Sequence, residues 1–427
     1  MSAGGREGTT MLHGHRHRQG TRQPPALLVA LGSGALIAAA LGLRVSSSLP
    51  APKVEVLTSA SVVTAPGSSQ PLPWPAAGQA AVGVADVGAG IAGSHGGSIP
   101  VPIASLAKMM TALIVLRDHP LGGYSQGPAV EVTAKDAAGF EVDLSTDQSS
   151  VPLEQGEVLT ERQLLQALLV RSANDVAEML ARWDAGSVAG FVAKMNATAA
   201  AMGLRSTTYT DPSGFLPTTV STAVDQLKVA EAAMALPAFA QIVDEPEVSL
   251  PLITGPVANI VSEIGSNGIV GVKSGITNQS GGCAVIAADR SVWNRTVLVI
   301  AVVLGQQGGG SLRVAAKDAV ALVDSAAKSL EELAPVARGA VVAHVVVPWA
   351  TTDQRVPVVA ASTASVIAWP TERVEVTVLP AKLPARPLSA GSPAGVLVVS
   401  AGPQRLDVQL ALKDALKGPS FWWRLIR

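Results

Sequence analysis

The sequence predicts an α+β protein with a separate all-β domain at its C-terminus and a membrane segment near its N-terminus. Between residues 74 and 335, runs with helical spacing of apolar residues alternate with short apolar strands. Beyond Pro335, the apolar residues fall into short β-branched runs separated by proline, glycine or polar residues. Residues 26–43 form one apolar run without a charged side chain. With 427 residues, the chain is long enough for two domains and a large core.

The N-terminal segment has the composition of a membrane anchor. The first 25 residues are polar and contain four arginines and one glutamate. As a helix, the apolar run that follows is about 27 Å long, which is close to a bilayer core of about 30 Å. Arginines ahead of such a run favour a cytoplasmic N-terminus. We therefore expect a cytoplasmic basic tail over residues 1–25 and a single-pass membrane anchor over residues 26–44, with the rest of the chain outside the cytoplasm; a secretory signal that is cleaved after export is the alternative.

Charge and cysteine content exclude two classes of protein. The net charge is −1, aromatic residues make up 3% of the chain, and no aromatic-and-basic face stands out. We therefore expect no nucleic-acid partner. The single cysteine, Cys283, excludes a disulfide framework within the chain. Its apolar surroundings predict a small buried strand residue.

The segment before the first domain, residues 45–73, is rich in serine, proline and valine, and we expect it to be a linker. The domain that follows, residues 74–335, starts with the runs AAVGVADV and GIAGS, which predict a hairpin. Next, SLAKMMTALIVLRD predicts a buried helix. The segment TERQLLQALLV opens with Thr160 and Gln163, a Thr-x-x-Gln capping box that marks the start of a helix.

Further elements complete this domain. Three segments predict helices: NDVAEMLARW, SVAGFVAKMNATAAAMG and TAVDQLKVAEAAMA. Three runs with turn residues between them predict consecutive antiparallel strands: GIVGVKSGIT, GCAVIAADR and RTVLVIAVVLG. A helix over residues 311–333 closes the region.

Residues 336–427 predict a small all-β domain. Its strands are expected in the runs GAVVAHVVVPW, RVPVVAA, SVIAWP, RVEVTVLP, GVLVVSAG and RLDVQLAL. The chain ends in LKDALKGPSFWWRLIR, where two tryptophans stand beside arginines. We interpret this end either as a contact with a membrane interface or as a cap on the β domain.

Ser105 and Lys108, at the start of the predicted buried helix, are candidates for a nucleophile and its base. A serine hydroxyl reacts only when another group takes its proton. A histidine base is not favoured, because the sequence contains no G-x-S-x-G motif. Lysine serves as a base when burial or a second cation holds it neutral. Residues three apart project from one face of a helix, and free N–H groups in its first turn can stabilise an oxyanion.

Two later motifs strengthen this interpretation, since S-x-x-K alone also occurs in ordinary helices. Ser172-Ala173-Asn174 stands between two predicted helices, in a loop able to enter a cleft. Lys273-Ser274-Gly275 stands on an otherwise apolar strand, where a lysine is avoided unless it has a role. The ordered set S-x-x-K, S-x-N and K-[ST]-G is the signature of penicillin-recognising serine acyltransferases.

The region from Trp74 to Ala327 resembles the low-molecular-mass penicillin-binding proteins of the D-alanyl-D-alanine carboxypeptidase family (serine peptidase family S11), in actinobacterial style. The blocks that carry the resemblance are PIASLAKMMTA, LLVRSANDVAEMLA, MNATAAAMGLRSTTYTDPSGF and GVKSGITNQSGGCAVIAA. The resemblance implies a β-lactamase/transpeptidase-like catalytic domain, with an antiparallel sheet and a helical cluster. It also implies a peptidoglycan stem peptide ending in D-Ala-D-Ala as substrate, β-lactam antibiotics as covalent inhibitors, and no metal or cofactor.

The resemblance implies catalytic roles for the first two motifs. Ser105 would be the acylated nucleophile and Lys108 the base for its proton. Ser172 would relay a proton to the leaving amine. Asn174 would bind a substrate amide and help to orient Lys108.

The third motif would bind the substrate. The resemblance implies that Lys273 lowers the pKa of the catalytic lysine and attracts the substrate carboxylate. Ser274, where threonine is commoner, would bind that carboxylate, and Gly275 would let the strand approach the ligand closely. The backbone N–H groups of Ile276 and of the nucleophile would form the oxyanion hole, and Thr277 would line the same strand edge.

Two other functions share these motifs. A class A β-lactamase needs a glutamate in an E-x-x-L-N context to activate the deacylating water, and none of the glutamates between Ser172 and Lys273 has that context. A non-hydrolytic cell-wall-binding penicillin-binding protein would keep the fold without turnover, which the intact motifs argue against. The predicted function is therefore a serine-type carboxypeptidase that trims the terminal D-alanine.

Overall fold

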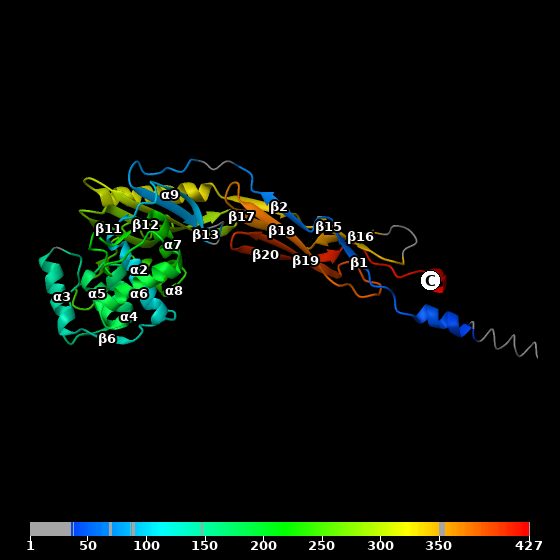
Figure 1. The fold of residues 1–427 in the computed structure, drawn as a ribbon, viewed down its shortest axis with the longest axis horizontal. Coiled ribbons are helices and arrows are strands. Elements are labelled where there is room, and N and C mark those ends of the chain that lie inside the picture. The colour runs from blue at the N-terminus through cyan, green and yellow to red at the C-terminus, as the bar shows by residue number, and fades with distance from the viewer. Residues whose placement is uncertain are drawn as a thin grey trace, which may run out of the picture.

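The computed structural model describes residues 36, 38–67, 71–85, 87, 90–146, 148–349 and 355–426. They form two lobes: a broad α/β lobe and a long, narrow β-rich lobe that extends from one side of it (Figure 1). The predicted basic tail, residues 1–25, and most of the predicted anchor, residues 26–44, lie outside these ranges. Among the helices within the ranges, none is long and apolar enough to cross a membrane.

The broad lobe is built on a five-stranded antiparallel sheet with the strand order β11-β12-β13-β3-β4. The predicted hairpin is confirmed, because β3 and β4 pair, and so is the run of three consecutive antiparallel strands. Helices cover both faces of the sheet, which explains why its strands are continuous apolar runs rather than alternating ones. The strands are β3 (Gln79–Val84), β4 (Ile91–His95), β11 (Ile269–Thr277), β12 (Gly281–Val292) and β13 (Arg295–Gln306).

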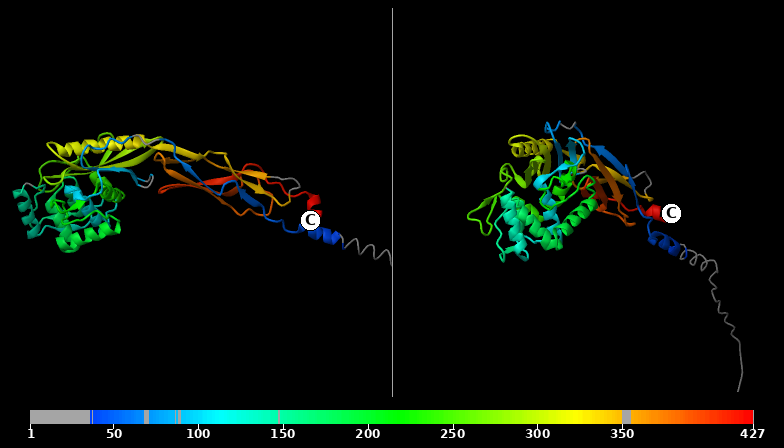
Figure 2. Two further views of the ribbon diagram at one scale, coloured as in Figure 1. Left: turned by 45° about the horizontal axis from the view of Figure 1, so that its top comes forward. Right: turned by 60° about the vertical axis from the view of Figure 1, so that its left-hand side comes forward.

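Helix α9 (Ser311–Lys328) covers one face of this sheet along its length (Figure 2). The expectation of a helix up to residue 333 was wrong by about one turn, because the chain leaves the helix after Lys328 and forms β14 (Glu331–Val336). Pro335 disfavours helical geometry at the residue before it. Strand β14 pairs with β17 (Ala364–Ala368), so the chain enters the narrow lobe here.

The opposite face of the sheet carries a cluster of helices around α2 (Ala107–Asp118). Every residue of α2 from Ala107 to Leu116 is buried, which explains its apolar composition on all sides. The predicted capping box is confirmed at the start of α4, where Thr160 and Gln163 bond each other's backbone N–H groups. The other helices of this cluster are α4 (Glu161–Leu169), α5 (Asn174–Ala185), α6 (Val188–Ala201), α7 (Ala223–Met234) and α8 (Pro237–Val243).

Helix α3 (Ala134–Ser145) lies at the outer edge of the broad lobe (Figure 1) and has no counterpart among the predicted elements. Asp136 is its one fully buried residue, and only Ala137 and Phe140 pack partly buried against the core, so the apolar stripe on which a sequence prediction depends is short. A capping box between Thr133 and Asp136 starts the helix. Arg182 of α5 binds the Asp136 carboxylate at 2.7 Å and holds α3 against the cluster.

Short two-stranded ladders connect these elements. β5 pairs with β8, β6 with β7, and β9 with β10. Their bounds are β5 (Val101–Pro102), β6 (Ala129–Glu131), β7 (Val158–Thr160), β8 (Val220–Ser221), β9 (Glu247–Val248) and β10 (Val257–Ala258).

The narrow lobe contains a seven-stranded sheet with the order β1-β15-β16-β20-β19-β18-β2. Its C-terminal strands overlap the predicted β-branched runs, with β19 and β20 starting one or two residues earlier than predicted. Alternate side chains point into a separate apolar core, as expected for strands with one buried face. The strands are β15 (Val341–Val346), β16 (Arg355–Ala360), β18 (Arg373–Pro380), β19 (Pro393–Ala401) and β20 (Gln404–Leu412).

The interpretation of residues 45–73 as a linker was wrong in part, because this segment supplies both outer strands of that sheet. β1 (Lys53–Val56) pairs with β15, and β2 (Ala60–Thr64) pairs with β18. The sequences KVEV and ASVVT alternate between more exposed and partly buried residues, which is the pattern of an edge strand. The many serines and prolines around them hide this alternation.

The two ends of the described chain meet at the tip of the narrow lobe, opposite the broad lobe (Figures 1 and 2). Residues 38–46 are helical, and a short helix α10 (Phe421–Ile426) lies beside them. Arg424 Nη1 donates a hydrogen bond to the Val45 carbonyl at 2.9 Å. Phe421 and Trp422 of α10 are exposed.

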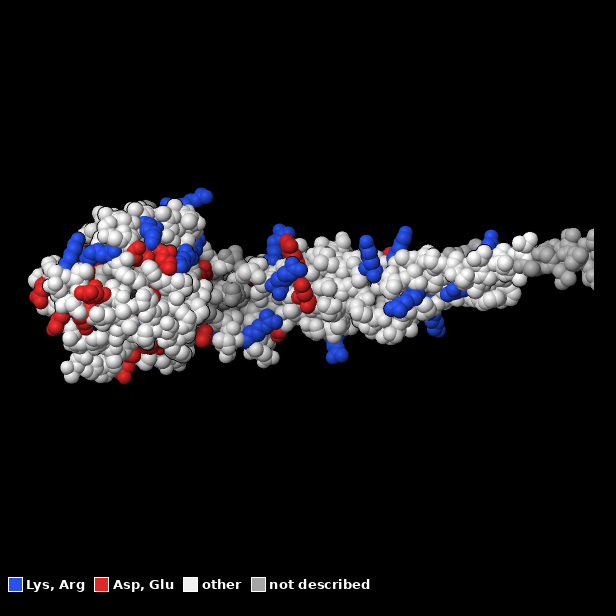
Figure 3. Space-filling view, turned by 90° about the horizontal axis from the view of Figure 1, so that it is seen from below, with Lys and Arg blue, Asp and Glu red and all other residues white. Residues whose placement is uncertain are grey.

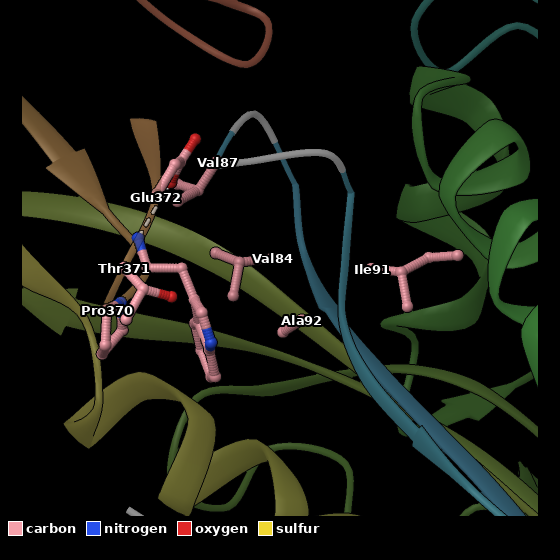
Figure 4. A pocket seen from close by; sticks show the side chains of 8 residues that line it. Val84, Val87, Ile91, Ala92, Pro370, Thr371 and Glu372 are labelled. Atoms are coloured by element: carbon pink, nitrogen blue, oxygen red, sulfur yellow. Dashed lines mark hydrogen bonds between the residues drawn. The ribbon is translucent and has the colours of Figure 1, made fainter. Parts of the chain in front are cut away.

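The two lobes contact each other at the β3–β4 hairpin. A cavity of about 170 Å³ lies between this hairpin and the turn that follows β17 (Figure 4). Val84 and Ile91 line it from the broad lobe, and Pro370 and Glu372 from the narrow lobe. None of the three sequence motifs contributes a lining residue, so the junction is separate from the motif residues.

Candidate active site

The first motif occupies the turn that leads into α2. Ser105 lies in a 3₁₀ turn, η1 (Ala104–Leu106), which continues directly into the helix. Ala104 has a φ of +48°, a left-handed conformation that non-glycine residues rarely adopt. Strained backbone of this kind concentrates at functional sites. The turn presents Ser105 at the end of a buried helix.

Lys108 is fully buried one turn after Ser105. Its Nζ lies 2.9 Å from Ser105 Oγ, 2.6 Å from Asn174 Oδ1 and 3.1 Å from the Ser213 carbonyl oxygen. A neutral amine has two N–H bonds and one lone pair. The amide and carbonyl oxygens accept the two hydrogens, so the lone pair of a neutral Lys108 faces the serine hydroxyl. This geometry suits proton transfer from nucleophile to base.

The surroundings of Lys108 favour its neutral form. Burial lowers its pKa to about 7, although Asp211, Asp175 and Asp143 act in the opposite direction. Lys273 is also fully buried, and burial followed by the charge of Lys108 lowers its pKa well below the ordinary value. The charge of Lys273 was expected to lower the pKa of Lys108. Burial is instead the main cause of the low pKa of Lys108, and the charge of Lys108 lowers the pKa of Lys273.

Strand β11 at the edge of the sheet carries the third motif. Lys273 Nζ donates to the Ser274 carbonyl at 2.9 Å. Lys273 pairs with Val285, whose side chain belongs to the core under the helical cluster, whereas Ser274 pairs with Ala284 in the core under α9. The two side chains therefore point to opposite faces of the strand. Ser274 Oγ is buried and has no hydrogen-bond partner among the described residues.

Gly275 brings this strand against the nucleophile. A Cβ atom at this position would lie 2.6 Å from the Ser105 backbone nitrogen and 3.0 Å from Ser105 Cβ. A side chain cannot be accommodated there without moving the strand. Beyond it, Ile276 is 54% exposed. The hydroxyl and N–H of Thr277 both donate to Ser280 Oγ, so Thr277 is part of the turn to β12.

The second motif lies in the loop between α4 and α5. Ser172 has a φ of +67°, and its Oγ is buried without a hydrogen-bond partner among the described residues. Asn174 begins α5, and its side chain joins two parts of the site. Its Oδ1 faces Lys108, and its Nδ2 donates to Gln148 Oε1 at 2.7 Å. The structure thus places Asn174 in direct contact with Lys108.

Two contributors to the site were not found from the sequence. The loop at residues 211–215 supplies the Ser213 carbonyl to Lys108, and Asp211 shapes this loop by accepting from Ser213 Oγ at 2.7 Å and from the Phe215 N–H at 2.9 Å. Thr111 of α2 donates to the Pro212 carbonyl at 2.7 Å. From the block TDPSGF only a turn could be predicted, because every residue type has a backbone carbonyl and the sequence does not show which one contacts Lys108. Gln148 is the second contributor.

No group of three or more histidine, cysteine or acidic residues in the described part of the chain has a geometry that could hold a metal ion. Cys283 is buried on β12, as expected of a small strand residue, and burial raises the pKa of its thiol to about 11. A thiol in this state is a poor nucleophile. The described groups of the site are the Ser105 hydroxyl, the Lys108 amine, the Asn174 amide and the Ser213 carbonyl, with the Asp211 carboxylate in the loop beside them.

Comparison with known proteins links this arrangement to one family. Residues 78–308, more than half of the chain, match the family Peptidase S11, D-alanyl-D-alanine carboxypeptidase. The chain is 34% identical over 250 residues to D-alanyl-D-alanine carboxypeptidase DacB2 of Mycobacterium tuberculosis, covering 57% of this chain and 81% of that protein. It is 31% identical over 214 residues to a D-alanyl-D-alanine endopeptidase of Pseudomonas aeruginosa, covering 48% of this chain and 66% of that protein.

The fold has solved counterparts as well. The structure of a peptidoglycan synthesis regulatory factor (PBP3) from Streptococcus pneumoniae superposes with a TM-score of 0.60 at 21% identity, covering 80% of this chain and 99% of that one. Because this coverage exceeds the length of the broad lobe, the likeness in fold extends into the narrow lobe.

Proposed function

The chain belongs to the peptidase S11 family of D-alanyl-D-alanine carboxypeptidases, and from this premise we propose that Ser105 is the residue its substrate acylates. The protein is a serine-type D-Ala-D-Ala carboxypeptidase, a hydrolase. The observation that carries the proposal is the position of Lys108 Nζ, 2.9 Å from Ser105 Oγ and held by two acceptors.

In the acylation step, Ser105 Oγ attacks the carbonyl carbon of the penultimate D-alanine. Lys108 takes the hydroxyl proton as the new C–O bond forms. The backbone N–H groups of Ser105 and Ile276 receive the charge that develops on the carbonyl oxygen. As the C–N bond breaks, the proton passes from Lys108 through the Ser172 hydroxyl to the departing amine of D-alanine. The Ser172 hydroxyl is buried and has no hydrogen-bond partner among the residues that the structure describes, which supports this relay because such a hydroxyl can bond a ligand.

In the deacylation step, water attacks the ester carbon. Lys108 takes a proton from the water, and the proton returns to Ser105 Oγ as the ester bond breaks. The products are the shortened stem peptide and the regenerated serine. Each step uses the same lysine first as base and then as acid, which a pKa of about 7 favours near neutral pH.

The carboxylate of the substrate is expected at β11. We propose that Lys273 attracts it and that the close approach of Gly275 fixes its distance from Ser105. The Ser274 hydroxyl, on the opposite face of β11 from the Lys273 side chain, would bind the carboxylate from that face at the strand edge. A bound carboxylate would stabilise the charged form of Lys273, which burial disfavours in the free site. Thr277, which the structure places in the turn with Ser280, would shape the end of the strand rather than bind the ligand directly.

β-Lactam antibiotics mimic the same substrate and are expected to acylate Ser105. A class A β-lactamase is not favoured, because none of the glutamates between Ser172 and Lys273 stands in the E-x-x-L-N context that activates the deacylating water of those enzymes. The adduct with benzylpenicillin should therefore be long-lived in time-resolved mass spectrometry. Rapid loss of the adduct would favour the β-lactamase.

The test of the proposed function is the release of D-alanine from a defined pentapeptide by a fragment of residues 44–427. Wild type is expected to release D-alanine and to take up a fluorescent penicillin. Ser105→Ala is expected to lose both properties, because no second hydroxyl replaces the nucleophile. Labelling that survives this substitution would overturn the assignment of Ser105, and labelling without D-alanine release would favour a non-hydrolytic protein.

We also propose that the protein is held at the outer face of the cell membrane by residues 26–44. The two described chain ends meet at the tip of the narrow lobe, and the exposed Phe421 and Trp422 lie there beside Arg424. Aromatic and basic side chains of this kind favour a membrane interface. In the face shown in Figure 3, basic side chains predominate along the outer half of the narrow lobe. Fractionation of cells that express the full chain, with and without residues 1–44, tests this location.

A further inference from the structure

We propose that Gln148 is a positioning residue that fixes the orientation of the Asn174 amide, and through it the amine of Lys108, by a hydrogen-bond chain with one possible direction. The inference rests on the proposed function, because it concerns the base that activates Ser105. The chain starts at the C-terminal end of α3, an element that none of the three motifs includes.

The first link sets the direction. Thr146 Oγ1 lies 2.9 Å from the Val142 carbonyl oxygen and 3.3 Å from the Asp143 carbonyl oxygen, both in the last turn of α3. Carbonyl oxygens only accept, so the single hydroxyl hydrogen of Thr146 is used in this contact. Towards any other neighbour, Thr146 Oγ1 must accept.

The second link orients Gln148. Its side-chain amide lies against Thr146 Oγ1, with Nε2 at 2.9 Å. Only the amide nitrogen can donate to an oxygen that must accept. The opposite end of the amide, Oε1, is therefore turned towards Asn174.

The third link orients Asn174. Its Nδ2 donates to Gln148 Oε1 at 2.7 Å, which leaves Oδ1 facing Lys108 Nζ at 2.6 Å. If the Asn174 amide were reversed, its oxygen would face the Gln148 oxygen and its N–H groups would face the lysine amine. The chain thus forces an acceptor onto Lys108, and this acceptor directs the lysine lone pair at Ser105.

The backbone holds the links in register. The Gln148 N–H donates to the Asp143 carbonyl at 2.9 Å, and the Asn174 N–H donates to the Ser149 carbonyl at 2.7 Å. At the other end of α3, Arg182 of α5 binds Asp136. The start of α5 is therefore joined to the segment that follows α3 at Gln148 and Ser149, and the end of α5 is joined to the beginning of α3, which makes the segment a support for the catalytic lysine.

Removal of Gln148 should change the chemistry of Lys108 in a specific way. A free Asn174 amide can rotate and present N–H groups to Lys108, which disfavours the charged amine and lowers its pKa. The other charged groups that act on Lys108, Asp143, Asp175, Asp211 and Lys273, stay in place. The acid limb of the acylation profile should then move to lower pH, while the plateau rate falls because the lone pair is less well aligned.

The test compares wild type with Gln148→Met, a variant of similar size without hydrogen-bonding groups. The second-order rate constant for acylation by a fluorescent penicillin is measured from about pH 5 to about pH 9. We expect the plateau to fall about tenfold and the acid limb to shift downward. Gln155→Met, in the same segment but with an exposed side chain, is the matched control and should behave as wild type.

A double-mutant cycle separates positioning from a general effect on the loop. If Gln148 acts through Asn174, Gln148→Met should cause no further loss in an Asn174→Ala background. Thr146→Val removes only the first link, so it should shift the pH profile of acylation in the same direction by a smaller factor. This variant replaces Gln148→Met in the test if Gln148→Met folds poorly.

The inference would be overturned if the losses of acylation rate from the two single mutants multiplied in the double mutant. It would also be overturned if the pH profile of Gln148→Met coincided with that of wild type. Either result would leave the proposed function intact. A wild-type chain that takes up no label would instead overturn the proposed function, and the role of Gln148 with it.

Discussion

At Lys108, three oxygen atoms surround one nitrogen, and their chemistry decides which form of the lysine reacts. The Ser213 carbonyl and Asn174 Oδ1 only accept, whereas Ser105 Oγ can both donate and accept. The neutral lysine satisfies all three neighbours and leaves its lone pair on the serine. The charged lysine also bonds all three, but it has no lone pair with which to take a proton. The reactive form is therefore the deprotonated one.

This sets the expected pH dependence of acylation. Burial lowers the pKa of Lys108 to about 7, so the neutral fraction increases as the pH rises through this value. The rate constant for benzylpenicillin acylation should be low at acid pH, rise with a midpoint near pH 7 and reach a plateau above it. Stopped-flow measurements over this range give the profile. A midpoint close to the ordinary lysine value, near 10.4, would show that Lys108 is not held neutral.

The residues of the site differ in how far the sequence reveals them. Ser105, Lys108 and Asn174 could be predicted because their roles require particular side chains at fixed spacings, and the structure brings them together. The contact of the Ser213 carbonyl could not be predicted, because any residue in that turn offers the same atom. The role of Gln148 could not be predicted either, because its hydrogen bond with Asn174 depends on how the end of α3 meets the start of α5.

At the scale of elements, the site depends on the contact between strand β11 and the turn η1. Gly275 has no room for a side chain, since a Cβ would lie 2.6 Å from the Ser105 nitrogen and 3.1 Å from Ala104 Cβ. On the other side of the turn, Gly214 has a φ of +79°, and a Cβ there would lie 1.8 Å from the Ala104 carbonyl oxygen. Two glycines thus hold the nucleophile turn between the strand and the loop that carries Ser213.

Gly275→Ala is therefore expected to push β11 away from Ser105 and widen the proposed oxyanion hole. Acylation by penicillin should fall by about 100-fold, because a shift of about 1 Å in a catalytic contact has this effect. Gly309→Ala is the matched control, since nothing lies within 4 Å of a Cβ at that position. Circular dichroism should show both variants folded. An alanine variant at 275 that acylates at the wild-type rate would contradict the close packing described.

The elements themselves were predictable where local signals agreed. The buried helix α2, the capping box of α4 and the strands β11 to β13 combine apolar runs with clear boundaries. Helix α3 has only a short apolar face, in which Ala137 and Phe140 pack partly buried against the core, and the ion pair between Asp136 and Arg182 and its capping box add to this contact. Strands β1 and β2 were hidden in a serine- and proline-rich segment, and their partners, β15 and β18, lie about 300 residues later in the chain.

At the scale of the whole molecule, the catalytic lobe stands at one end of a long body, and the two ends of the described chain lie at the other (Figure 2). If residues 26–44 anchor the protein, the narrow lobe acts as a spacer that holds the site away from the membrane. Because the sheet of this lobe has strands from both ends of the chain, its stability depends on residues 53–64 as well as on the C-terminal part.

Truncation tests this dependence. A fragment of residues 71–427 lacks β1 and β2, so it exposes β15 and β18 as unpaired edges and uncovers the partly buried Val54 and Val56 contacts with the core of the narrow lobe. In a fragment of residues 44–427, the narrow lobe is expected to give its own calorimetric transition. In the shorter fragment, we expect this transition to be absent or to occur at a temperature at least about 10 °C lower.

The catalytic lobe should tolerate the same truncation, because neither of its two apolar clusters, one of which also includes Ile367 of β17, contains a residue of β1 or β2. Penicillin acylation by the shorter fragment is therefore expected to stay close to that of the longer one when both are measured below the first transition. Equal calorimetric traces would show that β1 and β2 are dispensable edges. Loss of acylation together with the narrow-lobe transition would show that the contact at the β3–β4 hairpin couples the two lobes.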